Sequence, residues 1–258
     1  MNLKWASRFE LKPGTWVFVP TEQSVQTGKE IKNAIEKRWK PPRNFYHLRE
    51  GGHVDALKSH LENASFIHLD IQDFFGSVNR TRVTRCLKDI FGYAKAREIA
   101  NASTVMHPNR EGRQYILPFG FVQSPIIASI CLYKSALGAQ LRKLQSMEGV
   151  IVSVYVDDII LSTADKSIAP FVLSQAKRAA EKAGFNLNAN KEEGPADKIS
   201  AFNIELSHQL LEIQRDRWLE FIEALKVSES EDQKNGILGY VASVNCVQGD
   251  TLITGTAA

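Results

Sequence analysis

Two short apolar runs dominate the hydrophobic pattern of this chain. Val150–Ser162 is mostly β-branched and apolar, and its only charges are Asp157 and Asp158 near its middle. Because β-branched side chains favour strands and Asp favours turns, this run predicts two buried strands joined by a tight turn. Phe66–Ile71 predicts another buried strand, with Asp70 near its end. The pattern therefore predicts carboxylates at the tips of buried strands.

Helical periodicity appears in three longer stretches. Thr27–Lys40 has one apolar face and is followed by Pro41-Pro42, which end a helix. Ser124–Leu144 begins with a capping Ser and then Pro, and it is apolar nearly all round through Leu137, which predicts one helix buried beneath the sheet. Ile168–Ala183 is amphipathic, and Gly184 suits the left-handed position after a helix. This alternation of strands and helices predicts an α+β, ferredoxin-like sheet.

Two polar stretches flank these elements. Residues 80–97 carry six basic residues against one acid, with apolar residues at helical spacing, and predict a helix with a basic face. Such a face is most often solvated surface, but beside a nucleic-acid site it can follow a phosphate backbone. Ser228–Gly236 is polar and charged and predicts a loop between two C-terminal helices.

The carboxylates suggest a chemistry. If the strand of Asp70 neighbours the strands around Asp157 and Asp158, three carboxylates converge at one end of the sheet. Adjacent buried carboxylates repel each other, and hard cations such as magnesium or manganese relieve the repulsion. Two such ions about 4 Å apart support in-line phosphoryl transfer. For Asp157-Asp158 alone, an ordinary turn remains the alternative.

Composition limits the class of protein but does not decide its function. The chain has 258 residues, of which 43% are hydrophobic, enough for one large or two small domains. A net charge of +3 is a weak signal for nucleic acid. No apolar run approaches the length of a membrane span, and residues 1–7 lack a signal-peptide core. The cysteines are few and scattered, Cys86, Cys131 and Cys246, which predicts free thiols and a cytoplasmic protein.

The histidines do not predict a zinc site. His47, His53, His60 and His68 show no close spacing and no accompanying cysteine pair. His53 and His60 are expected to form hydrogen bonds near Arg49. His68 lies on the predicted strand of Asp70 and is expected to face the other side of the sheet.

Several segments occur in a specific order between residues 45 and 206. The segments are Phe45–Leu57, Asp70–Val78, Leu117–Pro125, Tyr155–Asp158, Gly184–Lys191 and Ala201–Leu206. Each is weak alone, but in this order they resemble an arginine-bearing segment and the five following motifs of the reverse transcriptases. The likeness is to the bacterial kind found in retrons, group II introns and phage-defence systems.

The resemblance implies a fold and an activity. It implies a right-hand polymerase, with fingers and palm in residues 1–206 and a short or truncated, partial thumb in residues 207–258. It implies two-metal transfer of deoxynucleotides to a primer on an RNA template, with Mg²⁺ or Mn²⁺ as cofactor. The implied partners are template RNA, DNA primer or product, a structured non-coding RNA, a second protein chain supplying a thumb, and no membrane. It also implies a role in phage defence.

The resemblance also assigns roles to individual residues. The implied catalytic residues are Asp70, Asp157, Asp158 and Lys191, and the implied metal ligands are Asp70, Ile71, Asp157 and Asp158. The implied substrate-binding residues are Phe75, Phe119, Gly120, Gln123, Tyr155 and Val156. The implied nucleic-acid contacts are Arg49, Arg80, Arg82, Arg85 and Lys88. Phe75 would be the aromatic gate under the sugar and Lys191 would serve the departing pyrophosphate, with core packing and surface exposure as their respective alternatives.

The chain departs from the family pattern in three places. Phe119 stands where many relatives have Gln, residues 1–44 show no match to a basic finger hairpin, and only residues 207–258 follow the last motif. Two other functions therefore stay open, a nucleic-acid-binding palm subunit with little activity alone and an RNA-templated RNA polymerase. A nucleotide cyclase is disfavoured, because Gly51-Gly52 is followed by His53 rather than by two carboxylates.

Overall fold

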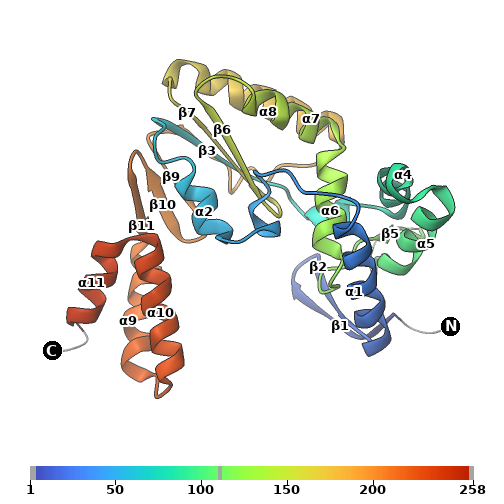
Figure 1. Ribbon diagram of the computed structural model, residues 1–258, viewed down its shortest axis with the longest axis horizontal. Coiled ribbons are helices and arrows are strands. Elements are labelled where there is room, and N and C mark those ends of the chain that lie inside the picture. The colour runs from blue at the N-terminus through green and yellow to red at the C-terminus, as the bar shows by residue number, and fades with distance from the viewer. Residues whose placement is uncertain (1–3, 110–111, 256–258) are drawn as a thin grey trace.

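A four-stranded antiparallel sheet lies at the centre of the computed structural model, which describes residues 4–109 and 112–255 (Figure 1). Its strands, in the order β6-β7-β3-β8, are β6 (Val150–Tyr155), β7 (Asp158–Thr163), β3 (Ser65–Asp70) and β8 (Glu193–Ala196). All three strands predicted from the apolar runs are confirmed. β3 pairs with β7 so that Asp70 lies opposite Asp158, which confirms the predicted convergence. Residues 1–3 of the N-terminal segment discussed above lie outside the described residues.

Helices cover one face of the sheet. They are α6 (Ser124–Tyr133), α7 (Ala136–Gln145) and α8 (Ala169–Ala183), which share a core cluster with Ile67 and Leu161 of the strands. Gly184 follows α8 with φ +67°, as predicted. The single predicted helix 124–144 is wrong, because Ser135 starts a new helix by accepting a hydrogen bond from the Gly138 amide (3.1 Å).

The opposite face of the sheet packs on different elements. Phe66 and Ile160 contact a second core cluster that contains α2 (Gly52–Lys58) and the sheet β11-β10-β9. Those strands are β9 (Lys198–Ala201), β10 (Ile204–Ser207) and β11 (Leu210–Ile213). Because side chains alternate along a strand, His68 and Asp70 project to this same face as Phe66.

The finger region begins with a hairpin that the sequence analysis missed. β1 (Trp5–Lys12) pairs with β2 (Thr15–Pro20), and Gly14 makes the turn with φ +81°. Nearly every residue of β1 is exposed, so no apolar face marked the strand. The prediction that residues 1–44 lack a basic finger hairpin is therefore wrong.

Helices complete the fingers. α1 (Glu22–Glu36) is capped by Thr21 and so begins before the predicted start at Thr27. The predicted basic helix 80–97 is two helices, α4 (Arg80–Phe91) and α5 (Tyr93–Ser103), because Gly92 breaks it with φ +78°. The remaining short elements are η1 (Tyr46–Leu48), α3 (Phe74–Ser77), β4 (Val105–Met106), β5 (Tyr115–Ile116) and η2 (Lys166–Ile168).

The C-terminal region forms a small helical unit. Its helices are α9 (Arg215–Val227), α10 (Glu231–Val244) and α11 (Cys246–Gly255). The predicted loop 228–236 is mostly helix, because Ser230 caps α10 by accepting from the Gln233 amide. The predicted boundary at residue 206 falls within β10. In Figure 1 these helices and the β1-β2 hairpin extend to the same side of the central sheet, at opposite ends.

The cysteines and the apolar character of the helices can be compared with the sequence predictions. Cys86 and Cys131 are buried free thiols, as predicted, and Cys246 is exposed. Among the described helices, none combines the length and apolar character that crossing a membrane requires.

Candidate active site

Three carboxylates meet where β3 and β7 lie side by side. Asp70 ends β3 and is buried, Asp158 begins β7 opposite it, and Asp157 lies in the turn between β6 and β7. The Ile71 amide donates to the Asp157 carbonyl (2.9 Å), which ties the end of β3 to this turn. Val156 occupies the turn with φ +58°, a left-handed conformation that is rare for a β-branched residue. The sequence prediction that these carboxylates converge is confirmed.

The electrostatics of the cluster reflect an excess of negative charge. Burial, followed by the charges of Asp158 and Asp70, raises the pKa of Asp157 to about 6. Lys191 Nζ contacts Asp70 Oδ2 at 2.7 Å, and this hydrogen bond raises the pKa of Lys191 above its ordinary value. The Asn188 side chain donates to Asp70 Oδ1 (3.2 Å). The structure thus brings Lys191 into the cluster, as the resemblance implied.

His68 belongs to this cluster as well. Its Nε2 lies 2.8 Å from Asp158 Oδ1, and its Nδ1 lies 3.0 Å from the Ser200 carbonyl oxygen. The expectation that His68 faces the other side of the sheet is wrong, because residues two apart on a strand share a face. That spacing from Asp70 was the signal in the sequence.

The carboxylates have the chemistry of a divalent-cation site. Three hard oxygen donors with a single ammonium beside them leave negative charge that a cation would offset. Asp70 and Asp158 now engage Lys191 and His68. Within residues 4–109 and 112–255, no three acidic, histidine or cysteine side chains form a ready-made metal cage. The donor set fits Mg²⁺ or Mn²⁺ if these two contacts are exchanged for metal contacts.

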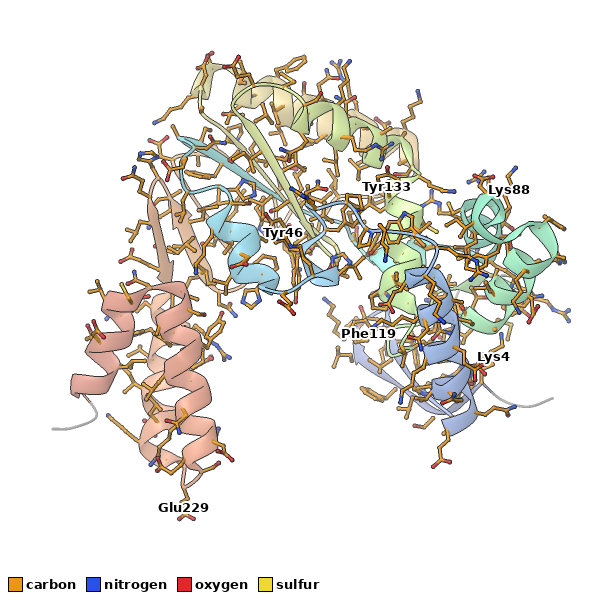
Figure 2. The ribbon with its side chains drawn as sticks, in the orientation of Figure 1. Lys4, Tyr46, Lys88, Phe119, Tyr133 and Glu229 are labelled. Atoms are coloured by element: carbon orange, nitrogen blue, oxygen red, sulfur yellow. The ribbon has the colours of Figure 1, made fainter. Side chains whose placement is uncertain are left out.

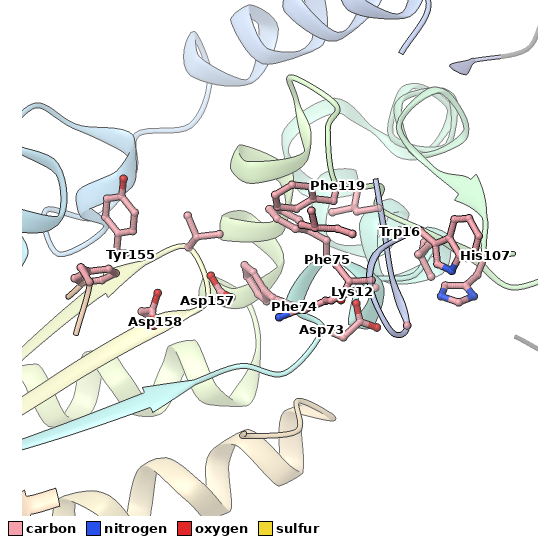
Figure 3. A pocket seen from close by; sticks show the side chains of 18 residues that line it. Lys12, Trp16, Asp73, Phe74, Phe75, His107, Phe119, Tyr155, Asp157 and Asp158 are labelled. Carbon is pink, nitrogen blue, oxygen red and sulfur yellow. The ribbon is translucent and has the colours of Figure 1, made fainter. Parts of the chain in front are cut away.

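A cavity of about 440 Å³ opens beside the carboxylates (Figure 3). Asp157 and Asp158 lie on one wall, and Lys12 and Trp16 of the finger hairpin lie on another. The sequence did not predict these hairpin residues, because β1 has no buried apolar face. The cavity therefore has Asp157 and Asp158 on one side and Lys12, with Asp73 beside it, on the other.

Aromatic rings line the floor of this cavity. Phe75 and Phe119 pack edge to face, with ring centroids 5.8 Å apart. Residues 74–77 form one helical turn, and Phe74 is the more buried of the two neighbouring rings. Tyr155 and Val156 also line the cavity. Four of the six residues implied for substrate binding are thus brought to one space.

The other two implied substrate-binding residues have structural surroundings. A Cβ at Gly120 would collide with the Phe18 carbonyl, and φ is +109°, so close approach of β2 already explains this glycine. Gln123 is buried and its amide donates to Ser103 Oγ (3.3 Å). The structure does not bring Gln123 to the cavity, because its side chain turns toward α5 and Gly28 of α1.

The implied nucleic-acid contacts lie on two separate parts of the fingers. Arg49 stacks on Tyr46 and donates to the Arg43 carbonyl. Arg80 lies over the Tyr115 ring at 3.5 Å, and Arg82 lies over Phe185 at 4.6 Å and donates to the Ala183 carbonyl. Arg85 and Lys88 lie on α4 and are exposed. In Figure 2 Lys88 lies at the outer edge of the molecule, and Glu229, between α9 and α10, lies at the opposite end.

An aromatic cluster joins the turn between β6 and β7 to the C-terminal helices. Tyr155 packs on His53 and Phe202, with centroids 5.8 and 5.2 Å apart. His53 Nε2 lies 3.0 Å from the Tyr240 hydroxyl of α10. Phe202 and Asn203 both have positive φ, at the tip of the β9-β10 turn. The sequence predicted hydrogen bonding for His53 but not this link.

Comparison with known proteins agrees with this architecture. The profile of the family described as reverse transcriptase (RNA-dependent DNA polymerase) matches residues 20–204. A structure of apo telomerase from Candida tropicalis has a TM-score of 0.54 at 15% identity, covering 88% of this chain and 44% of that one. Telomerase from Candida albicans, in complex with a TWJ fragment of telomeric RNA, gives 0.52 at 10% identity, covering 90% and 47%. No curated protein sequence matches the chain.

These structural similarities concern the fold of the chain. At such identities they show a shared fold, which is the α+β fold of right-hand polymerases. The chain spans less than half the length of the two telomerase chains that it matches.

Proposed function

The chain belongs to the reverse transcriptase family, and we propose that it is an RNA-directed DNA polymerase that adds deoxynucleotides to a primer on an RNA template. One observation carries the proposal. Asp70 lies opposite Asp158, and Asp157 and Asp158 line a cavity that is also lined by Lys12. A nucleoside triphosphate fits this division, because its phosphates need cations and its reacting phosphorus needs a place beside the carboxylates.

Metal ligation falls to the same carboxylates in this proposal. Asp70, Asp157 and Asp158, with the Ile71 carbonyl, would hold Mg²⁺ or Mn²⁺. Such ions, when bound, lower the pKa of an attacking hydroxyl and offset charge on a departing pyrophosphate. The raised pKa of Asp157 supports this assignment, because a cation would relieve the repulsion that contributes to it.

The surrounding residues supply binding and selection. Phe75 would lie under the sugar and exclude a 2′-hydroxyl, with Phe119 supporting its ring at 5.8 Å. Lys191 would donate a proton or positive charge to the departing pyrophosphate, since its ammonium already lies beside Asp70. Lys12 would contact the triphosphate from the finger side. Gly120, Tyr155 and Val156 would shape the space for the base and the primer end.

The biological setting rests on the sequence resemblance. We propose RNA template and DNA primer or product as partners, with a structured non-coding RNA or a second protein chain as companion. Arg49, Arg80, Arg82, Arg85 and Lys88 stay predicted contacts to nucleic acid. The retron-like subtype, the phage-defence role and the cytoplasmic location also stay predictions.

Primer extension tests the proposal. Purified chain is incubated with primed RNA, labelled dNTPs and Mg²⁺ or Mn²⁺, beside Asp157→Asn as the inactive control. Product from the wild-type chain alone supports the polymerase. Retained RNA binding without product would favour the partner-subunit alternative, and extension with rNTPs in preference to dNTPs would favour an RNA polymerase.

A further inference from the structure

His47 contacts the catalytic turn from outside the carboxylate cluster. The Val156 amide donates to His47 Nδ1 at 2.9 Å. On the other edge of the ring, Nε2 lies 2.7 Å from Ser129 Oγ of α6, which donates to the Pro125 carbonyl at 2.7 Å. The His47 ring also packs edge-on against Tyr155, with centroids 5.8 Å apart. The His47 side chain therefore joins the turn between β6 and β7 to α6.

The direction of these hydrogen bonds is fixed by chemistry. A backbone amide can only donate, so Nδ1 must be the unprotonated nitrogen and Nε2 must carry the proton that reaches Ser129. Burial lowers the pKa of His47 to about 4, against a smaller raising effect of the Val154 backbone. The ring is consequently neutral at physiological pH, as an acceptor must be.

The segment that carries His47 is itself held against the sheet. The Val154 amide donates to the Asn44 carbonyl at 2.8 Å, and Phe45 forms a parallel bridge with Val154. His47 follows this bridge in η1, so β6 sets the position of its ring. The ring position is therefore set by contacts within the chain.

The contact with His47 is made by a residue in a strained conformation, Val156. A β-branched residue at φ +58° is strained and keeps that conformation only where its surroundings impose it. The neutral His47 ring accepts a hydrogen bond from the Val156 amide, and this bond stabilises the strained backbone conformation. Asp157 follows directly, so the rotation of this peptide sets where the carboxylate lies.

We infer that His47 is a positioning residue that holds the Tyr155–Asp158 turn in its strained conformation, with Ser129 fixing the His47 tautomer. The inference rests on the proposed polymerase function for its kinetic consequence. The hydrogen-bond network itself can be measured without activity, so the two can fail separately.

Two substitutions separate the hydrogen bond from ring packing. His47→Phe keeps a ring against Tyr155 and removes the acceptor, whereas His47→Asn can place Oδ1 near the position of Nδ1. In primer extension, we expect kcat of His47→Phe to fall on the order of 10- to 100-fold with KM for dNTP changed less than about twofold, because misplacing a reacting group costs that much. His47→Asn should recover kcat to within about fivefold of the wild type. Equal losses in both variants, or a wild-type kcat in His47→Phe, would overturn the inference.

Milder and matched changes guard against misfolding. Ser129→Ala removes the acceptor for Nε2 with almost no change in volume, and should lower kcat by about 3- to 10-fold. His208→Phe alters a histidine remote from the turn, whose Nδ1 lies 3.0 Å from the Asn63 carbonyl oxygen, and should leave kcat unchanged. An unchanged kcat in Ser129→Ala counts against the role given to Ser129.

Strain relief provides a test of the proposed purpose. Glycine adopts positive φ without penalty, so in Val156→Gly the turn depends less on His47. The fold-loss of kcat caused by His47→Phe should therefore be smaller when it is introduced into the Val156→Gly variant than when it is introduced into the wild type. An equal loss in both backgrounds would contradict the idea that His47 opposes strain.

Nuclear magnetic resonance gives the readout that needs no catalysis. In the wild-type chain we expect a slowly exchanging Val156 amide and a His47 ring protonated at Nε2 near pH 7. A fast-exchanging amide or the other tautomer overturns the inference whether or not the chain polymerises. A protected amide in a chain that makes no product would instead count against the proposed function.

Discussion

Asp157→Asn should stabilise the metal-free protein while abolishing polymerisation. The carboxylate lies in a partly buried turn beside Asp158 and Asp70, and its pKa is raised to about 6. Replacing it with a neutral isostere removes the partly buried charge and its repulsion, and keeps the shape. Activity should be lost, because the cluster then has one carboxylate fewer to hold divalent cations.

The magnitude follows from the pKa. A folded-state pKa of about 6 against the ordinary 3.8 corresponds to about 3 kcal/mol of destabilisation at neutral pH, at about 1.36 kcal/mol per pH unit. Asp157 retains some contact with water, which screens part of the repulsion, so we expect a gain of about 1–2 kcal/mol in the free energy of unfolding.

The gain should depend on pH with a definite sign. Below pH 3.8 the carboxyl is protonated in both the folded and the unfolded chain, so wild type and variant should be equally stable. As pH rises from 3.8 to about 6, the unfolded wild-type chain loses this proton more readily than the folded one, and the wild type loses stability relative to the variant. Above about pH 6 the difference should be constant.

Urea unfolding in EDTA at pH values from about 4 to about 8, which span the two pKa values, measures the difference. Asp165→Asn is the matched control, because hydrogen bonds from the Ser167 amide and hydroxyl lower the pKa of that exposed carboxyl, and its loss should bring no gain. Mg²⁺ should stabilise the wild type more than Asp157→Asn. A variant that is less stable than the wild type at neutral pH, or a difference that does not change with pH, would refute the electrostatic argument.

Three further predictions concern the cavity and its cations. Phe75→Val should raise rNTP incorporation relative to dNTP by roughly 10- to 100-fold, measured by steady-state kinetics, and an unchanged ratio would leave Phe75 as core packing. Lys191→Met should lower kcat by about tenfold or more while tightening Mn²⁺ binding measured by calorimetry, because the ammonium no longer occupies Asp70; weaker Mn²⁺ binding would contradict this. Lys12→Gln should raise KM for dNTP by about fivefold and reduce its salt dependence, whereas Lys29→Gln on the exposed side of α1 should not; the same KM in both variants would remove Lys12 from the site.

Burial explains which parts of the fold could be predicted from the sequence. β3, β6 and β7 are covered on both faces, so their apolar residues occur in short runs instead of alternating with polar residues. The hairpin β1-β2 is exposed along most of one strand, so selection for an apolar face left no pattern there. The apolar positions of Ser124–Leu144 continue beyond Lys134, and the capping geometry of Ser135 marks the start of α7.

The site residues likewise divide into those that the sequence predicted and those that it did not. The carboxylates could be found because a charge at the tip of an apolar strand is costly and therefore conspicuous. The contact between His68 and Asp158 joins residues 90 apart in sequence, and the contact between His47 and Val156 joins residues 109 apart. Such pairs depend on strand order and register, which hydrophobic pattern alone does not specify.

The contacts around the carboxylates differ in how readily they can change. Backbone amides hold the turn itself, through Ile71 to the Asp157 carbonyl and Val156 to His47, and neither bond uses a carboxylate oxygen. The carboxylate oxygens are engaged instead by Lys191 and His68, and a bound cation would replace these contacts. In the proposed active site, the geometry would be kept while the charge partners are exchanged, because the groups that fix position are not those that would bind metal. The strain at Val156 and the raised pKa of Asp157 then have the same origin. Both arise because a fixed turn presents negative charge to the cavity.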